Sequence, residues 1–316
     1  KKNFMKKINI IYLLPEMKGA SGGAKVIYNH SLKLNKIRKN VSSSVLHLKK
    51  KFSYKIEASL SKKFNIFKEQ YSGWNPNKMK VSKFFSPSSN WYDKNINSKK
   101  KFSLDKNTDF LIIPEIWSHF PEDLNLKKKG INYGIFIQGF FHMNSTSNFK
   151  KLKSAYKNAK IILISSDYNI KCFREMFPEF KNKIFRINFS INYQKLKISK
   201  KINTITYMPR KLPDHSQLLL FYLKNLLPKN WKIIPLDNVS EDYLIETLSR
   251  SKFFLSFSNF EGLGIPPIEA ALCGNKVIGY TGGGGIEYWK EPIFKKIENG
   301  DINKFGKKLL YEIKNY

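Results

Sequence analysis

Short apolar segments separated by helical patterns are the feature that most constrains the fold of this chain. Runs such as "INIIYLL" and "KIILIS" are compact and rich in β-branched residues, which is typical of buried strands. Apolar strands with intervening helices indicate parallel sheets covered on both faces. The predicted strands cover 8–14, 43–48, 109–114, 133–138 and 160–165 in one series, and 204–208, 231–236, 252–258 and 276–280 in another.

Two such series predict an α/β protein with two doubly wound, Rossmann-like domains and a cleft between them. The 316 residues are enough for two hydrophobic cores. A polar, basic stretch without periodicity follows residue 192 and is the predicted linker, so the expected domains are 1–197 and 198–316. Residues 49–105 contain clusters of Asn, Ser and Pro, and we interpret them as a basic, loop-rich insertion with some short elements.

Helix signals lie between the predicted strands. Ser240 is followed by two acidic residues, as expected of a capped helix start. Proline at the start and Gly274 at the end bound a second helix. The predicted helices cover 23–34, 215–227, 240–250 and 266–274.

The charge of the chain is strongly positive. It has 57 lysine and arginine residues against 24 aspartate and glutamate residues, a net charge of +33. Such an excess is typical of proteins that meet an anionic partner, such as nucleic acid, a membrane or a phosphorylated substrate. Broad compositional drift toward lysine produces the same pattern without any selected site, so both explanations stay open. Lysine runs at 49–51, 62–63 and 99–101 favour a basic surface around the insertion.

The sequence indicates a cytoplasmic protein. No apolar run has the length that spans a bilayer, and the run 8–14 is expected to be a first strand, not a secretion signal. Cys172 and Cys273 form neither a disulfide framework nor a zinc spacing.

Glycines and carboxylates are concentrated in "SNFEGLGIPPIEAALCGNKVIGYTGGGGIEYW", residues 258–289. Both glycine clusters follow predicted strands, and ligands of doubly wound sheets bind outside the carboxyl ends of the strands. Glycine lets a ligand approach the backbone, and glycine clusters form anion cradles. The helix near Pro266 is expected to direct its free N–H groups toward phosphate, with Glu269 in its first turn accepting hydrogen bonds from vicinal hydroxyls.

This stretch resembles the nucleotide-sugar motif of retaining GT-B glycosyltransferases of the family 4 type. That family typically carries "EGFGLPxLEAxAxGxPV", and this chain has "EGLGIPPIEAALCGNKV" with the same E-x7-E spacing. The family's "GGxxE" loop is matched by "GGGIE", and its N-terminal "GGAExV" by "SGGAKVI". The resemblance covers almost the whole chain, except the insertion.

The resemblance implies a role for each matching residue. Glu269 would bind the donor ribose, and Glu261 would contact the transferred sugar. Arg210 and Lys211 would neutralise the leaving diphosphate in place of a metal ion. The residues implied to line the donor are Gly22, Gly23, Gly262, Leu263, Gly264, Gly283 and Gly284.

The chain departs from the family pattern in two places. The family's lysine usually lies several positions after the position of Lys211. Many members also end an N-domain strand with a histidine near the donor sugar, where this chain has Gln138; His142 follows four residues later. Gln138 is therefore the candidate for a hydrogen bond to a sugar hydroxyl. Glu115 and His119 are expected at the cleft mouth, on the acceptor side.

The implied activity is metal-independent transfer of a hexosyl or deoxyhexosyl group, with retention, from a UDP-, GDP- or dTDP-linked sugar to an acceptor hydroxyl. A glycan, a lipid-linked molecule or a protein is the expected acceptor, in cell-surface glycan or polysaccharide synthesis on the cytoplasmic face of a membrane. The alternatives are a DNA-modifying glycosyltransferase, a basic nucleic-acid-binding protein and a sugar epimerase of the same fold.

Overall fold

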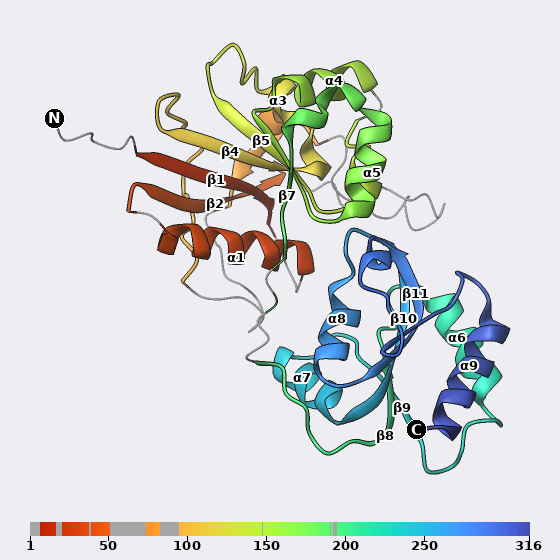
Figure 1. The fold of residues 1–316 in the computed structure, drawn as a ribbon. Coiled ribbons are helices and arrows are strands. Elements are labelled where there is room, and N and C mark those ends of the chain that lie inside the picture. The colour runs from red at the N-terminus through yellow and green to blue at the C-terminus, as the bar shows by residue number, and fades with distance from the viewer. Residues whose placement is uncertain are drawn as a thin grey trace. The chain divides into compact units, whose positions relative to one another are not determined.

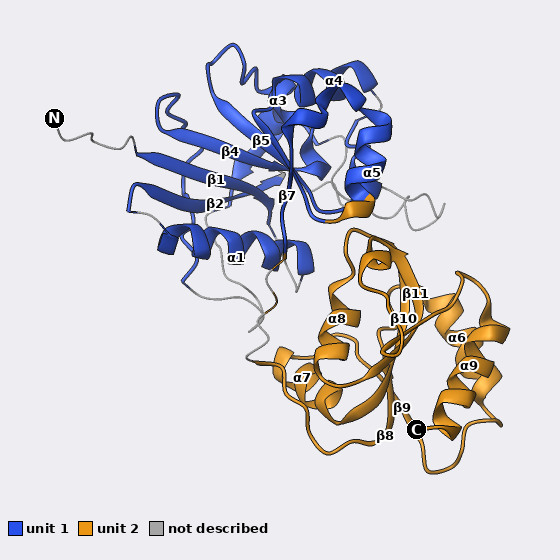
Figure 2. Cartoon of the chain, viewed as in Figure 1, with its two compact units in different colours: residues 1–165, 169–188 blue, residues 166–168, 189–316 orange. Residues whose placement is uncertain are grey.

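A computed structural model describes residues 7–16, 21–37, 39–50, 74–82, 95–146, 148–189, 191 and 195–316. The chain forms two compact units (Figure 2). Unit 1 comprises residues 1–165 and 169–188, and unit 2 comprises 166–168 and 189–316. The sequence analysis placed its domain boundary between residues 197 and 198.

Unit 1 is built on a seven-stranded sheet in the order β3-β2-β1-β4-β5-β6-β7. Neighbouring strands are parallel except β3, which pairs antiparallel with β2. The strands are β1 (Ile8–Pro15), β2 (Val41–Lys50), β3 (Met79–Val81), β4 (Asp109–Pro114), β5 (Asn132–Ile137), β6 (Ile161–Ile164) and β7 (Ile184–Arg186). The helices are α1 (Gly22–Ile37), α3 (Phe120–Asp123), α4 (Phe149–Asn158) and α5 (Asp167–Met176), with 3₁₀ turns η1 (Pro76–Lys78), η2 (Glu115–Trp117), η3 (Phe140–His142) and η4 (Pro178–Lys183).

Unit 2 contains a five-stranded parallel sheet in the order β12-β11-β10-β8-β9. Figure 1 shows α7 and α8 on one face of this sheet and α6 and α9 on the other. The strands are β8 (Ile202–Tyr207), β9 (Lys232–Pro235), β10 (Ser251–Glu261), β11 (Lys276–Gly283) and β12 (Phe294–Lys296). The helices are α6 (Pro213–Leu223), α7 (Glu241–Arg250), α8 (Ile265–Leu272) and α9 (Ile302–Lys314), with the 3₁₀ turn η6 (Gly284–Glu287).

Each unit has its own core, because helices cover both faces of its sheet. Ile11, Leu13 and Ile135 lie at the centre of the unit 1 core, and Phe253, Leu255 and Ile278 at the centre of the unit 2 core. The expectation of two doubly wound α/β domains is therefore confirmed. No helix in the described ranges is both long and apolar enough to cross a membrane.

The helix signals of the sequence act as expected. The Ser240 side chain accepts a hydrogen bond from the Tyr243 N–H at 3.2 Å and caps α7. Gly274, with φ 80°, ends α8 in a left-handed conformation, and the N–H groups of Gly274 and Asn275 bond back to Ala271 and Ala270. These two hydrogen bonds form a Schellman motif, which satisfies the last carbonyl groups of the helix.

The predicted insertion lies largely outside the described residues, which omit 51–73 and 83–94. Its described parts include the end of β2, the turn η1 and the short strand β3. Residues 95–100 run beside β2, where Val45 forms a bridge with Ser98.

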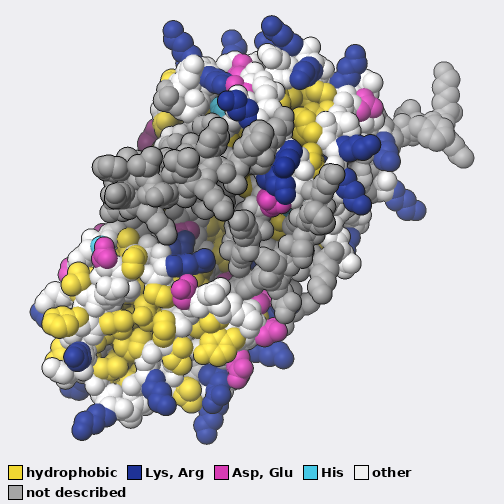
Figure 3. All heavy atoms as spheres, turned by 180° about the vertical axis from the view of Figure 1, so that it is seen from behind, with side chains coloured by type: hydrophobic (Ala, Val, Ile, Leu, Met, Phe, Trp, Pro, Cys, Tyr) yellow, Lys and Arg dark blue, Asp and Glu magenta, His cyan; other side chains and the backbone are white. Residues whose placement is uncertain are grey.

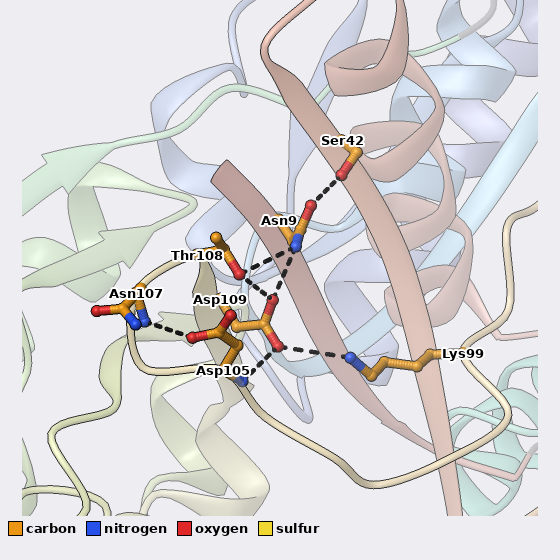
Figure 4. A network of polar contacts seen from close by, with 7 residues as sticks. All are labelled: Asn9, Ser42, Lys99, Asp105, Asn107, Thr108 and Asp109. Carbon is orange, nitrogen blue, oxygen red and sulfur yellow. Dashed lines mark hydrogen bonds and ion pairs between the residues drawn. The ribbon is translucent and has the colours of Figure 1, made fainter. Parts of the chain in front are cut away.

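A polar network ties three neighbouring strands of unit 1 together at their amino ends (Figure 4). The buried Asp109 carboxylate of β4 accepts hydrogen bonds from the Asn9 side chain of β1 at 2.9 Å and the Asp105 N–H at 3.0 Å. The Ser42 hydroxyl of β2 donates to Asn9 at 2.6 Å. Burial raises the pKa of Asp109, but these bonds and the Lys99 charge outweigh it and lower the pKa below its ordinary value.

Replacing Asp109 with Asn should lower the free energy of unfolding of unit 1 by about 1–3 kcal/mol at pH 7. The reason is that an NH₂ donor replaces one of the two carboxylate oxygens that accept hydrogen bonds in the network. The folded pKa is lowered, so the contribution of Asp109 is complete above its unfolded pKa of about 3.9 and is lost as the pH falls through the folded value. Urea denaturation of wild type and Asp109→Asn should therefore converge at acidic pH. Exposed Glu175→Gln on α5, outside the network, is the control, and an equal loss in both variants would contradict the network's role.

Candidate functional site

The carboxyl ends of three strands gather the site residues predicted in the C-terminal half. β11, β10 and β8 are parallel neighbours, so they end at the same edge of the sheet. Arg210 and Lys211 follow β8, Glu261 ends β10 and Gly283 ends β11. Open α/β sheets bind ligands at this edge.

Glu261 and Lys211 form an ion pair that joins the ends of β10 and β8. The Glu261 side chain is 18% exposed and the Lys211 side chain 36%, so the pair is open to solvent on one side. The pairing of β10 with β11 shifts register between Ser258 and Glu261, and Phe260 has φ 51°. This bulge turns the end of β10 out of the regular ladder. Arg210, beside Lys211, is exposed.

The glycine loop after β10 and the glycine loop after β11 are in direct backbone contact. A Cβ atom on Gly284 would lie 1.9 Å from the Gly262 carbonyl oxygen, so no other residue fits there without moving the backbone. Gly264 has φ 80° and is the N-cap of α8. The two glycine loops, 262–264 and 283–284, therefore pack against each other through their backbones.

Tyr288 fixes the position of the first glycine loop and was not predicted from the sequence. Its hydroxyl donates to the Gly264 carbonyl at 2.6 Å, and burial raises its pKa, so it stays a neutral donor. The signal that marks it is its position directly after the second glycine cluster, in "GGIEYW".

The start of α8 differs from the sequence prediction in two respects. Among its first three residues only Ile265 has an N–H, because Pro266 and Pro267 have none. The helix start therefore offers phosphate fewer donors than expected, and the anion-binding capacity of this edge depends more on Arg210 and Lys211. Because the helix begins at Ile265 and not at Pro266, Glu269 lies beyond the first turn. Its side chain is half-buried.

A small hollow opens between these elements. It lies against the Lys211 side chain, the end of β10 and the start of α8, within unit 2 alone. Its lining residues are Met208, Lys211, Phe254, Leu255, Phe257, Ser258, Pro266 and Pro267.

In unit 1, Gln138 contacts the glycines at the start of α1. The Gln138 amide donates to the Gly23 carbonyl at 3.2 Å, and a Cβ on Gly23 would lie 3.3 Å from the amide oxygen. A Cβ on Gly22 would meet nothing within 4 Å. Three of the predicted residues of the N-terminal half thus lie together at the carboxyl edge of the unit 1 sheet.

The expectation that Glu115 and His119 line the cleft mouth is wrong, because both are buried. Glu115 is 5% exposed and His119 2%. The His119 ring bonds to the Trp74 carbonyl at 2.7 Å, and burial lowers its pKa. His142 is exposed in η3, with its ring close to Gly139.

A polar cluster at the carboxyl ends of β1 and β2 was not predicted. Glu16 forms an ion pair with Lys49 at 3.1 Å and accepts a hydrogen bond from Ser82. In the ranges that the structure describes, no group of His, Cys, Asp and Glu has the arrangement of a metal site.

The chain has the GT-B fold. No protein-family model and no curated protein matches the sequence, but solved GT-B structures match the fold across nearly its full length. A variant of S. aureus TarM in complex with fondaparinux, α-GlcNAc-glycerol and UDP has a TM-score of 0.61 and 14% identity, covering 98% of this chain and 93% of TarM.

Two further structures have the same fold. Anabaena HepE in complex with UDP has a TM-score of 0.61 and 12% identity, over 98% of this chain and 89% of HepE. The lipopolysaccharide outer core galactosyltransferase WaaB has a TM-score of 0.59 and 13% identity, over 98% and 91%. At these identities the comparison establishes the fold alone.

Gly284→Ala should destabilise unit 2 by several kcal/mol, because its Cβ would overlap the Gly262 carbonyl and part the two loops. Gly22→Ala should leave the melting temperature unchanged within about 1 °C, because its Cβ enters open space. Differential scanning fluorimetry checks both variants. A Gly284→Ala protein as stable as Gly22→Ala would show that the loops are not in obligatory contact.

Proposed function

We propose that this protein is a retaining glycosyltransferase that moves a sugar from a nucleoside diphosphate sugar to an acceptor hydroxyl, in cell-surface glycan or polysaccharide synthesis. The observation that carries the proposal is the site at one edge of unit 2. There the Glu261–Lys211 ion pair and the two contacting glycine loops lie at the carboxyl ends of a GT-B domain.

We assign the donor's diphosphate to Arg210, Lys211 and the glycine N–H groups. A guanidinium and an ammonium neutralise charge that develops on a leaving phosphate, so the reaction needs no metal ion. With two prolines in the first turn of α8, these side chains carry most of that charge neutralisation. Lys211 is held in place before the donor binds, through Glu261.

We assign the transferred sugar to Glu261 and Gln138 and the ribose to Glu269. Gly22 and Gly23 leave the backbone of the α1 start accessible to the diphosphate. In the reaction the bond from the anomeric carbon to phosphate breaks, and the acceptor oxygen bonds to the same face of that carbon. The leaving phosphate takes the acceptor's proton, which accounts for retention without a protein nucleophile.

The solved structures of the same fold suggest which donors to test first. TarM and HepE are described in complexes with UDP, and WaaB as a galactosyltransferase. UDP-hexoses are therefore the first candidates, ahead of GDP- and dTDP-linked hexoses and deoxyhexoses. The acceptor is proposed to be a glycan, a lipid-linked molecule or a protein.

Glu269→Ala should weaken binding of the matching nucleoside diphosphate by roughly 1.5–3 kcal/mol, because a charge-assisted hydrogen bond to the ribose is lost. Glu261→Ala should reduce sugar transfer more than nucleotide binding. Calorimetry with UDP, GDP and dTDP measures affinity, and donor turnover with and without EDTA measures transfer. Exposed Glu246→Ala on α7 is the matched control.

Two outcomes would contradict these assignments. Unchanged nucleotide affinity in Glu269→Ala removes that residue from the donor site. Turnover that is abolished by EDTA and restored by manganese or magnesium removes the metal-independent mechanism.

We also propose that unit 1 meets an anionic membrane surface on the cytoplasmic side. The amino ends of its parallel strands lie at one edge of the sheet, opposite the carboxyl edge that carries Gln138 and Gly23. Ile8 and Ile37 are 40% and 67% exposed at this edge. Exposed lysines precede the strands there and form what we call the lysine edge: Lys7, Lys39, Lys106, Lys127, Lys128, Lys129 and Lys160.

Some lysines at the amino edge of the unit 2 sheet are held by protein partners, unlike those of the lysine edge. None of the lysines of the lysine edge forms an ion pair with a described residue. Figure 3 shows Lys and Arg side chains spread over one face of the molecule. In unit 2, Lys201 donates to the Ser251 and Cys273 carbonyls at 2.7 and 2.6 Å, and Lys276 pairs with Glu312 at 3.0 Å. Unpaired lysines interleaved with apolar side chains favour an anionic bilayer over duplex DNA, which is usually read by arginine.

Changing Lys127, Lys128 and Lys129 to Glu should release the protein from vesicles rich in anionic lipid, because each lysine contributes about 1 kcal/mol near such a surface. Liposome co-sedimentation measures this, with neutral vesicles and high salt as references. The control changes Lys200, Lys224 and Lys229 of unit 2 to Glu, with the same change of charge. Equal effects of both triples would favour compositional drift, and salt-dependent binding to duplex DNA alone would favour the nucleic-acid alternative.

A further inference from the structure

Glu115 is a buried carboxyl that the proposed reaction does not use. Glu115 follows β4 directly. The strand β5, which pairs with β4 in the sheet, ends at Ile137. The Gly139 N–H donates to a Glu115 carboxyl oxygen at 3.0 Å. Beyond the last backbone pair of β4 and β5, the Glu115 carboxyl thus accepts the hydrogen bond of the backbone N–H that follows β5.

The turn that Glu115 binds is held from a second side by α5 and the end of β6. The Ser165 hydroxyl donates to the Gln138 carbonyl at 3.1 Å. The Asn169 side chain accepts from the Phe140 N–H at 3.0 Å. Ser165 and Asn169 are fully buried, so the backbone from 138 to 140 is fixed by polar groups that water does not reach.

This turn directs the Gln138 side chain at the start of α1. Its amide donates to the Gly23 carbonyl at 3.2 Å and is half-buried. The amide stands where the proposed function places the donor sugar. Its position depends on the backbone that Glu115 binds, since a glutamine side chain has several rotatable bonds and one contact would not fix it.

We propose that Glu115 is a positioning residue that holds the Gln138–Gly139 turn, so that the Gln138 amide stands ready beside Gly23 to bind a hydroxyl of the donor sugar. The assignment of the sugar rests on the proposed function, whereas the holding of the turn does not. Loss of the carboxylate charge weakens the hydrogen bonding that holds the turn, because a protonated carboxyl or an amide accepts fewer N–H bonds.

The environment of Glu115 supports this role. Burial raises its pKa to about 7, while the N–H groups of Glu115, Gln138 and Gly139 act in the opposite direction. The carboxyl therefore changes charge near neutral pH. The titratable neighbours are His142 of η3, beside Gly139, and Tyr156 of α4, which burial keeps neutral; α1 and α5 contribute Gly23 and Asn169, which do not titrate.

Hydrogen exchange tests the turn without any substrate. In Glu115→Gln, amides in the segment 138–141 should exchange about tenfold faster than in the wild type at pH 8, which corresponds to the loss of one charge-assisted bond. After correction for intrinsic rates, the wild-type segment should loosen as the pH falls through 7, and Glu115→Gln should show no such step. His142→Asn should keep the step, and Glu122→Gln on α3 should behave as wild type.

A double-mutant cycle tests the connection to the sugar. Glu115→Gln should lower the turnover of the donor with little change in UDP affinity, and adding Glu115→Gln to Gln138→Ala should cause no further loss. Wild-type exchange rates in Glu115→Gln at every pH would overturn the holding of the turn. Additive losses in the cycle would overturn the proposal that Glu115 acts through Gln138. Altered exchange in a protein that turns over no nucleotide sugar would overturn the proposed function, but it would leave the role of Glu115 in holding the turn intact.

Discussion

The contact between the two glycine loops of unit 2 is the constraint on which the candidate site depends. The Gly262 carbonyl occupies the place where any side chain at position 284 would begin. This contact holds the ends of β10 and β11 together, next to the Glu261–Lys211 ion pair. Tyr288 fixes the first glycine loop where it meets α8, by donating a hydrogen bond to the Gly264 carbonyl. The two loops therefore act as one structural element, although the contacting residues Gly262 and Gly284 are 22 positions apart in the sequence.

Charge is organised differently at the carboxyl edges of the two sheets and at the amino edge of unit 1. At the carboxyl edges, acidic and basic groups are paired: Glu261 with Lys211, and Glu16 with Lys49. Such pairs are open to a ligand that offers better partners, as a diphosphate does for a lysine. At the amino edge of unit 1, the Asp109 network fixes the strands, and exposed lysines surround it without acidic partners among the described residues. Part of the excess of positive charge therefore lies at the amino edge of unit 1.

Most of the fold follows from patterns that lie within short segments. Buried parallel strands read as apolar runs, so β1, β4 and β5 were predicted to within a residue or two. Capping residues fixed the start of α7 and the end of α8. The helices α4, α5 and α9 were not assigned, because polar helices with a narrow apolar stripe resemble the polar stretches around them. The grouping of Glu261, Gly264 and Gly284 could be predicted because parallel strands end at a common edge.

The sequence by itself determined the fold class, the glycine loops and the residue types available for phosphate and sugar. Only the tertiary structure decided which of those groups act. It showed that α8 begins at Ile265, which places Glu269 beyond the first turn of the helix. It also placed Glu115 and His119 inside unit 1. Burial and hydrogen-bond partners depend on residues far away in the sequence, and Glu115 binds a backbone N–H that is 24 positions distant.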